Sequence, residues 1–243
     1  MRMFIFANRN AKEILRDPIN IFFSLGFPII LLLLLSAIQA NIPVALFEIQ
    51  HLAPGITVFG LAFLTLFCAT IISKDRSSSL AQRLYTTPLS SLDFILGYTL
   101  PIIPLAIAQT AICYIAALVL GLHFTINIIY AILSIIPISL LYIGLGLLCG
   151  SILNDKQVGG VCGALLTNLS AWLSGIWFDL NLVGGTFHKV ANILPFVHAV
   201  EMERAVLIGN SSDIFEHLLW VLGYGVFFLL LAILLFLRQM KHQ

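Results

Sequence analysis

The chain has 243 residues, of which 60% are hydrophobic and only 9% are charged, and its formal net charge is +1. Soluble domains carry about 25% charged residues, so this composition excludes a soluble protein and predicts an all-helical integral membrane protein. The small net charge also excludes a basic nucleic-acid surface.

The first 18 residues predict an amphipathic helix at the membrane interface. Phe4, Ala7 and Ile14 recur at helical spacing with Leu15 beside them, and charged side chains occupy other positions. Pro18 ends this helix and turns the chain into the bilayer. An ordinary cytosolic helix is the alternative. The apolar run that follows is long enough to span, so we expect no cleavable signal peptide.

Six apolar blocks are each long enough to cross a bilayer, which takes about 20 helical residues. In the fourth block, Gly146 and Gly150 are four residues apart, a spacing that predicts close packing against another helix. We treat 1–243 as one transmembrane domain. Its expected segments are 1–18 (interface helix), 20–40, 52–73, 97–121, 128–150, 158–177 and 218–237 (spans), 74–93 (polar connection) and 178–217 (long polar region).

The polar connection 74–93 separates two apolar blocks and must face water. Ser79 with Gln82 is typical of a capping box, and Pro88 ends the short helix that this box would begin. Two interpretations stay open for the segment: a solvated turn between spans, or a docking helix for a cytosolic partner.

The charge distribution predicts the orientation. With six spans and a cytosolic N-terminus, ten of the twelve Lys and Arg residues are cytosolic, and only Lys189 and Arg204 are external. Both termini and 74–93 are then expected in the cytosol, and 178–217 outside. Within 178–217, two short helices separated by Pro195 are expected at the interface or re-entering it.

The chemistry available inside the spans is limited. No Asp, Glu, Lys or Arg lies in the middle of an expected span, which argues against an ion-coupled carrier. Gln109, Tyr114 and Asn168 are polar; they either bond neighbouring helices or line a substrate path. The four cysteines form no C-x-x-C pair, and solvated loop charges are the default interpretation of His188 and His198, so no metal site is expected.

Sequence signatures of catalysis are also absent. The chain has no G-x-S-x-G, no H-E-x-x-H and no G-x-x-x-x-G-K-[ST] nucleotide loop. We therefore expect no enzyme activity and no cofactor in this chain. If it moves a substrate uphill, the energy must come from another protein through a cytosolic contact.

Four motifs follow one another across nearly the whole chain. They are Lys12-Glu13-Ile14-Leu15-Arg16-Asp17-Pro18; Ala53-Pro54-Gly55-Ile56; Arg83-Leu84 with Thr87-Pro88-Leu89-Ser90 and Leu96-Gly97; and Leu194-Pro195-Phe196-Val197-His198-Ala199 followed by Arg204. In this order, with six spans, the chain resembles the membrane (permease) subunit of a type-2 ATP-binding-cassette (ABC) exporter. Two departures stand out: Asp75-Arg76 replaces the acidic-basic pair of the family, and Tyr98 replaces its lysine.

The resemblance implies an inner (plasma) membrane permease that pairs with a second permease subunit, a homodimer rather than a heterodimer, and with a separate ATPase that binds ATP and Mg. It places Gly, Thr and aromatic positions of the second and fifth spans at the dimer interface. The ATPase-coupling residues would be Ser79, Leu80, Gln82, Arg83, Leu84, Tyr85, Thr87, Arg9 and Arg16. The substrate-path residues would be Gln109, Tyr114, Asn168, Pro195 and Phe196.

The main functional expectation is export of an amphipathic drug-like or lipid-like substrate. The alternative is a polysaccharide or lipid-linked glycan export permease of the same fold. A remote alternative is an intramembrane lipid-modifying enzyme, and a non-transporting membrane scaffold is a further rival.

Overall fold

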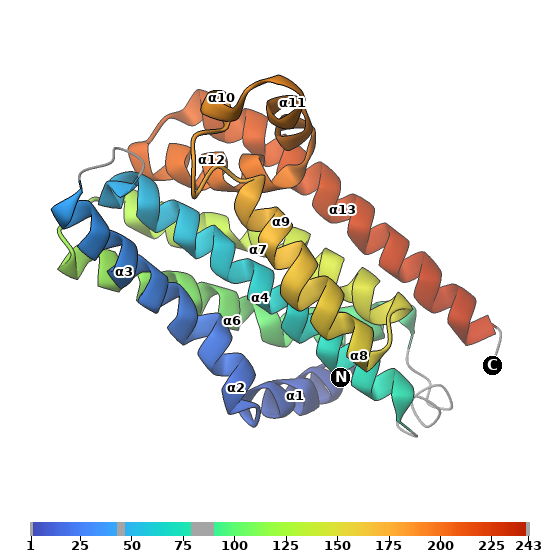
Figure 1. Ribbon diagram of the computed structural model, residues 1–243. Helices are drawn as coiled ribbons and strands as arrows, with labels where there is room; N and C mark the ends of the chain where they lie inside the picture. Colours follow the sequence, from blue (N-terminus) through green and yellow to red (C-terminus); the bar gives the residue numbers. More distant parts are fainter. Residues whose placement is uncertain (1, 43–46, 79–89, 242–243) are drawn as a thin grey trace.

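The computed structural model describes residues 2–42, 47–78 and 90–241, and these residues form helices joined by turns, with no strand among them. The expectation of an all-helical chain is confirmed for the described residues. Figure 1 shows α1 at one end of a bundle of long helices, and α10 and α11 at the opposite end. We call these the α1 end and the α11 end.

In chain order the helices (η marks π-helical segments) are α1 (Arg2–Leu15), α2 (Pro18–Ile21), η1 (Phe22–Gly26), α3 (Phe27–Asn41), α4 (Ile49–Ser77), α6 (Ser91–Val119), α7 (Asn127–Ile152), α8 (Asp155–Val158), η3 (Gly159–Leu166), α9 (Thr167–Trp172), α10 (Leu180–Val183), α11 (Gly185–Ile193), α12 (Pro195–Ile208) and α13 (Ser211–Lys241).

Five helical segments among the described residues are long and apolar enough to cross a membrane. They coincide with the expected first, second, third, fourth and sixth spans. The expected fifth span, 158–177, differs, because its helical run begins with the charged Asp155 and Lys156 and ends at Trp172. The five segments are Pro18–Asn41, Ile49–Ser77, Leu92–Val119, Asn127–Ile152 and Ser211–Arg238.

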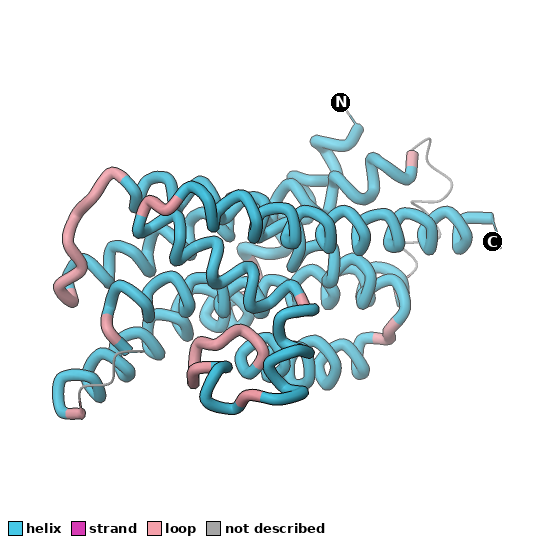
Figure 2. The backbone as a smooth tube through the Cα atoms, turned by 90° about the horizontal axis from the view of Figure 1, so that it is seen from above, coloured by secondary structure: helices cyan, strands magenta, loops and turns pink. Residues whose placement is uncertain are grey.

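Helix α4 is the centre of the bundle. Of its most apolar 18-residue stretch, 89% is buried, against 22% for the first candidate span and 17% for the last. Helices α3, α6 and α7 lie against it. Figure 2 shows the long helices running alongside one another, seen from above. Within one chain this burial leaves only a few partly buried side chains of the second span, such as Leu66 and Thr70, for the expected contact with a second copy.

Helix α7 lies directly against α4, as the spacing of its glycines predicts. A Cβ atom on Gly146 would lie 2.7 Å from Cys68 Cβ, and one on Gly150 would lie 2.8 Å from Ile72 Cβ. Neither position has room for a larger residue, so the two glycines set how closely the helix axes approach.

Helix α1 buries part of the apolar face that the sequence predicts, because Ala7 and Ile14 are buried, whereas Phe4 is 65% exposed and Leu15 is 71% exposed. Phe6 and Asn10 are also buried, and both contact Gly97 of α6. Helical periodicity therefore identified two of the buried positions but not Phe6 and Asn10.

The region 178–217 contains the two short helices that the sequence predicts. They are α11 and α12, and Pro195 is the first residue of α12. Gly209 ends α12 with a φ of +86°, a left-handed conformation that favours glycine. Unlike a free loop, α12 is buried over most of its length, so α12 is part of the core of the α11 end.

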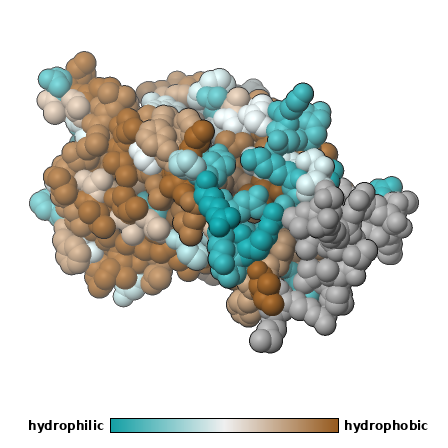
Figure 3. Space-filling model, turned by 90° about the horizontal axis from the view of Figure 1, so that it is seen from below, coloured by the Kyte–Doolittle hydropathy of each residue, from teal (hydrophilic) through white to brown (hydrophobic). Residues whose placement is uncertain are grey.

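The surface separates into apolar and polar parts. Seen from below, at the α1 end, a broad hydrophobic surface adjoins a group of hydrophilic side chains (Figure 3). Large apolar side chains are exposed on α3 and α13, as expected for helices that face lipid. The chain is therefore a multi-pass membrane protein, with hydrophilic side chains gathered at the α1 end.

We predict that Gly146→Ala destabilises the protein by about 1–3 kcal/mol, because the added methyl group meets Cys68 Cβ and the Thr65 carbonyl oxygen, at 2.8 Å, rather than a flexible side-chain tip. Thermal melting of the purified protein in detergent measures the loss. Gly159→Ala is the matched control, since no heavy atom lies within 4 Å of its added Cβ. Equal melting temperatures for the two variants would contradict the packing described for α4 and α7.

Candidate functional site

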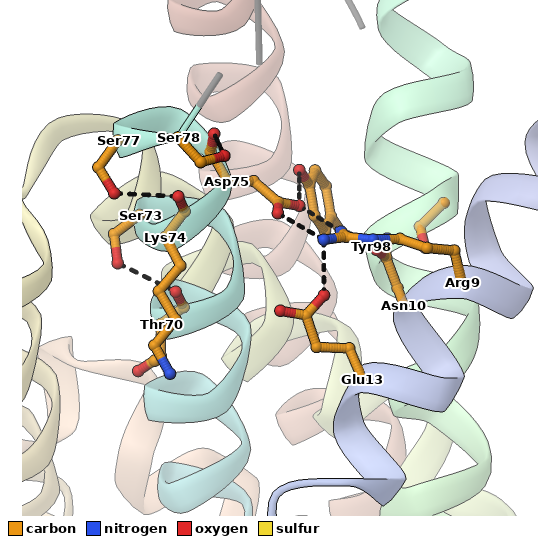
Figure 4. A network of polar contacts seen from close by, with 11 residues as sticks. Arg9, Asn10, Glu13, Thr70, Ser73, Lys74, Asp75, Ser77, Ser78 and Tyr98 are labelled. Atoms are coloured by element: carbon orange, nitrogen blue, oxygen red, sulfur yellow. Dashed lines mark hydrogen bonds and ion pairs between the residues drawn. The ribbon is translucent and has the colours of Figure 1, made fainter. Parts of the chain in front are cut away.

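Helices α1, α4 and α6 meet at a buried carboxylate. Asp75, in the last turn of α4, has a side chain that is only 5% exposed. The Arg9 guanidinium of α1 donates to both of its oxygens, at 2.6 and 2.8 Å (Figure 4). Such a two-bond pair fixes the relative orientation of the helices as well as their distance.

Helix α6 completes the same contact. The Tyr98 hydroxyl donates to Asp75 Oδ2 at 2.9 Å, and Asn10 Nδ2 donates to the carbonyl oxygen of Gly97 at 3.0 Å. We call Arg9, Asn10, Asp75, Gly97 and Tyr98 the junction network. Arg9 and Tyr98, which bond to the Asp75 side chain, lie on two other helices, so the network joins three segments that are distant in sequence.

An aromatic contact supports the junction network. Phe6 packs edge-on against Tyr98 at 5.0 Å and against Phe94 at 5.6 Å between ring centroids. A Cβ atom on Gly97 would collide with the Phe6 ring. Glycine at this position therefore lets α1 lie against α6.

Glu13 provides a second, weaker carboxylate for Arg9. Its Oε2 lies 2.8 Å from Arg9 Nη2, and both side chains are more than one-third exposed. Burial raises the pKa of Glu13, and the positive charge of Arg9 opposes that change. Asp75 rather than Glu13 is the main partner of Arg9, because only Asp75 is deeply buried and accepts two hydrogen bonds.

The residue after Asp75 connects α4 to a different set of helices. Arg76 Nη1 donates to the carbonyl oxygens of Gly150 at 2.7 Å and Leu153 at 3.2 Å, at the C-terminal end of α7. Ser73 also donates to Asp155 Oδ1 of α8 at 3.2 Å. The final turn of α4 is thus bonded to α1, α6, α7 and α8 together.

At the α11 end, Arg204 of α12 bonds separate segments of the chain together, as Arg9 does at the α1 end. Its side chain is 10% exposed and pairs with Glu201 at 2.8 Å. It also donates to the backbone carbonyl oxygens of His51 and Gly175, each at 3.3 Å. A Cβ atom on Gly55 would lie 3.7 Å from Arg204 Nη2. Two motifs far apart in sequence, one around Gly55 and one ending at Arg204, therefore meet at this end.

A second carboxylate is buried completely. Glu203 of α12 is 0% exposed, with Tyr114 Oη of α6 at 2.9 Å and Ser134 Oγ of α7 at 2.7 Å. Burial raises the pKa of Glu203 to about 7, and the hydrogen bonds with Ser134 and Tyr114 oppose that rise. The sequence analysis missed this acid because α12 lies outside the expected spans yet inserts Glu203 between two of them.

The expected ATPase-coupling residues fall into two groups. Arg9 belongs to the junction network, and Arg16 is exposed on the same end of the protein. The others lie outside the described residues; they are Ser79, Leu80, Gln82, Arg83, Leu84, Tyr85 and Thr87. Asp75 and Tyr98, which complete the contact of Arg9, were noted only as departures from a family pattern.

The expected substrate-path residues do not share one surface within the chain. Gln109 is buried and its Nε2 donates to the Thr57 carbonyl oxygen at 3.1 Å. Asn168 is exposed on α9, and its Nδ2 donates to the Ala164 carbonyl oxygen of the preceding η3. The remaining three, all buried, are Tyr114 at Glu203, Pro195 at the start of α12, and Phe196 beside Tyr142.

No group of three His, Cys, Asp or Glu side chains that could hold a metal ion occurs in the part of the chain that the structure describes. The arrangement is one of linked helices rather than of reacting groups. These contacts link other helices to both ends of α4.

Comparisons with known proteins agree with this picture. A family model described as "ABC-2 family transporter protein" matches residues 44–234. The chain is also similar to the capsule polysaccharide export inner-membrane protein CtrC of Neisseria meningitidis serogroup A, with 25% identity over 135 residues. That alignment covers 56% of this chain and 51% of the Neisseria protein, so the chain spans about half the length of the curated relative it matches.

Asp75→Asn should loosen α1. The amide cannot accept both hydrogen bonds from Arg9 and carries no charge, so we expect a loss of about 2 kcal/mol at this contact. Amide hydrogen exchange should show faster exchange in α1 but not in α7. The control is Glu13→Gln, which removes a more exposed partner of Arg9 and should change little. Unchanged protection of α1 in Asp75→Asn would refute the role of the junction network.

Glu203→Gln should change how stability depends on pH. The folded carboxyl group has a pKa of about 7 against 4.5 for the free group, so the folded state binds the extra proton and the wild type loses stability as pH rises from about 4.5 to 7. Glutamine mimics the protonated acid. The variant should match the wild type near pH 4.5 and be more stable above pH 7, by up to about 3 kcal/mol.

Thermal melting from pH 4.5 to pH 8 measures this difference. Glu216→Gln, an exposed position on α13, is the control and should follow the wild type. If the melting temperatures of Glu203→Gln and the wild type differed by the same amount at every pH from 4.5 to 8, Glu203 would be ionised throughout this range. The raised pKa of Glu203 would then be wrong.

Proposed function

Because this chain belongs to the ABC-2 family of transporter proteins, we propose that it is the membrane half of an ATP-driven polysaccharide exporter. The ABC-2 membrane permease family lacks an ATPase domain, so in this proposal ATP and Mg bind to a partner ATPase. The observation that carries the proposal is the junction network, which joins α1 and α6 to the end of α4, four residues before the segment 79–89.

The named relative favours a different substrate class from the one that the sequence analysis preferred. The Neisseria protein is a capsule polysaccharide export protein by name. That supports the glycan alternative over the amphipathic drug-like or lipid-like substrate that the sequence analysis preferred. We therefore propose a polysaccharide or lipid-linked glycan as the substrate of this chain.

We propose six membrane passes with both termini in the cytoplasm. The run from α8 to α9, continued by the turns that follow Trp172, would make the fifth pass. The basic residues gather at the α1 end, which the positive-inside rule assigns to the cytoplasm. The described ones there are Arg9, Lys12, Arg16, Lys74, Arg76, Lys156 and Arg238.

In this proposal α4 transmits the movement. The partner ATPase docks on the connection 74–93, at the cytoplasmic end of the helix. α4 has 29 residues and is about 43 Å long, so it reaches from the junction network to the contact of Gly55 with Arg204. A displacement of its cytoplasmic end carries α1, α6, α7 and α8 with it, because all four are bonded to the same turn.

The two arginines of α1 would have different tasks. Arg9 is engaged by Asp75 and so positions α1, whereas Arg16 is exposed and free to contact the ATPase. For the second permease copy, Trp172 of α9 is an aromatic position of the expected interface that one chain leaves exposed, and the exposed Leu165 of η3 would extend it.

Arg83→Glu should abolish substrate-stimulated ATP hydrolysis in the complex of this chain with its ATPase, because the substitution reverses a charge in the proposed docking helix. Cells that carry only this variant should retain the glycan inside, while the protein still inserts into the membrane. Hydrolysis in proteoliposomes and surface glycan on intact cells measure the two effects. Lys189→Glu, at the opposite end, is the control and should export normally.

Two results would overturn the proposal at different levels. Normal coupling in Arg83→Glu would remove the 74–93 segment from the mechanism. Undiminished surface glycan in cells that lack this chain altogether would refute the exporter function itself.

A further inference from the structure

A polar cavity of about 430 Å³ lies at the α11 end. This volume lies within the range of small-molecule sites in proteins, about 300–1,000 Å³. The cavity is walled by the beginning of α4, by α10, α11 and α12, and by the beginning of α13. The polar side chains that line it are mostly acids, amides and imidazoles, joined by one guanidinium.

Arg204 is the main donor in the cavity. The guanidinium has five N–H groups, and Arg204 uses three of them, for Glu201, His51 and Gly175. The side chain is nevertheless 90% buried. Two N–H groups therefore remain for a bound molecule, on a side chain whose position is held by three contacts.

Asp179 and Glu201 can each accept a further hydrogen bond. Asp179 Oδ1 accepts from Asn181, and Glu201 Oε1 accepts from Arg204. The second oxygen of each carboxylate has no hydrogen-bond partner among the described residues. The cavity thus places free carboxylate oxygens beside free guanidinium N–H groups.

A histidine pair lies beside these carboxylates. His198 Nε2 lies 2.9 Å from the carbonyl oxygen of Asn192, so this nitrogen must carry a proton. His198 Nδ1 lies 3.0 Å from His217 Nδ1, so one of these two nitrogens donates to the other. His217 lines the cavity, and its imidazole is a further hydrogen-bonding group there. Trp220 stacks on His198 at 4.7 Å and holds the ring in place.

This set of groups matches a sugar better than an anion. The lining contains three carboxylates, Asp179, Glu201 and Asp213, against one guanidinium, so phosphate or an acidic sugar would be repelled. A neutral pyranose has neighbouring hydroxyl groups, each of which can donate to a carboxylate or imidazole and accept from an arginine. We propose that this cavity is a binding site for a neutral hexose or N-acetylhexosamine unit of the glycan. The inference rests on the proposed function and narrows its substrate class.

Saturation-transfer-difference NMR on the purified full chain tests the proposal, with D-glucose, D-galactose and N-acetyl-D-glucosamine as the probes. The wild type should transfer saturation to the ring protons of at least one of these sugars. In Asp179→Asn with Glu201→Gln, the affinity should fall roughly tenfold or more, as for the loss of charge-assisted hydrogen bonds. Glu48→Gln is the matched control, since Glu48 lines a different cavity beside the start of α4.

Melting curves distinguish loss of the site from loss of the fold, and both substitutions preserve side-chain shape. No transfer to any of the three sugars in the wild type would overturn the proposal. Equal transfer in the wild type and the double variant would overturn it too, as would binding of inorganic phosphate in place of the sugars. None of these results touches the exporter function, which fails only if surface glycan persists without the chain.

Discussion

The structure depends on the pairing of one carboxylate. In a chain with so few charges, a buried Asp75 without a partner would cost several kcal/mol, and Arg9 and Tyr98 remove that cost by contributing hydrogen bonds from two other helices. An ion pair is a directional link, unlike the nonspecific apolar contacts that dominate the rest of the protein. It specifies where α1 lies and joins it to the helix at the centre of the bundle.

Each end of α4 lies at a buried charged group that links it to another helix. The group is a carboxylate at the α1 end and a guanidinium at the α11 end. At the α1 end a buried acid on α4 receives a guanidinium from another helix; at the α11 end a buried guanidinium from α12 lies against the narrow surface left by Gly55. Between them the helix is covered on nearly all sides. A buried rod with polar contacts at both ends is suited to passing displacement along its length, since apolar packing resists compression.

Much of the fold could be predicted from the sequence, because apolar runs and glycine spacing are local signals: five spans, the tight approach at Gly146 and the short helices around Pro195 were all found. The family resemblance was also correct. The contacts of the candidate site could not be predicted from the sequence. Nothing in the sequence pairs Asp75 with Tyr98, and Glu203 lies outside every span yet ends up between two of them. Such contacts depend on how helices cross, which periodicity does not encode.

The packing of Phe6 and Asn10 against α6 has a consequence for the insertion of the chain into the membrane. Asn10 and Gly97 are 87 residues apart, and at a synthesis rate of 5–20 residues per second the second appears about 4–17 s after the first. During that interval α6 is missing, and Asp75 of α4 is the first partner of α1 in the junction network to be made. The exposed Phe4 and Leu15 would keep the nascent helix on the lipid surface until α6 is inserted. Ribosome-bound chains that stop before Gly97 should therefore show α1 membrane-associated but unprotected from protease.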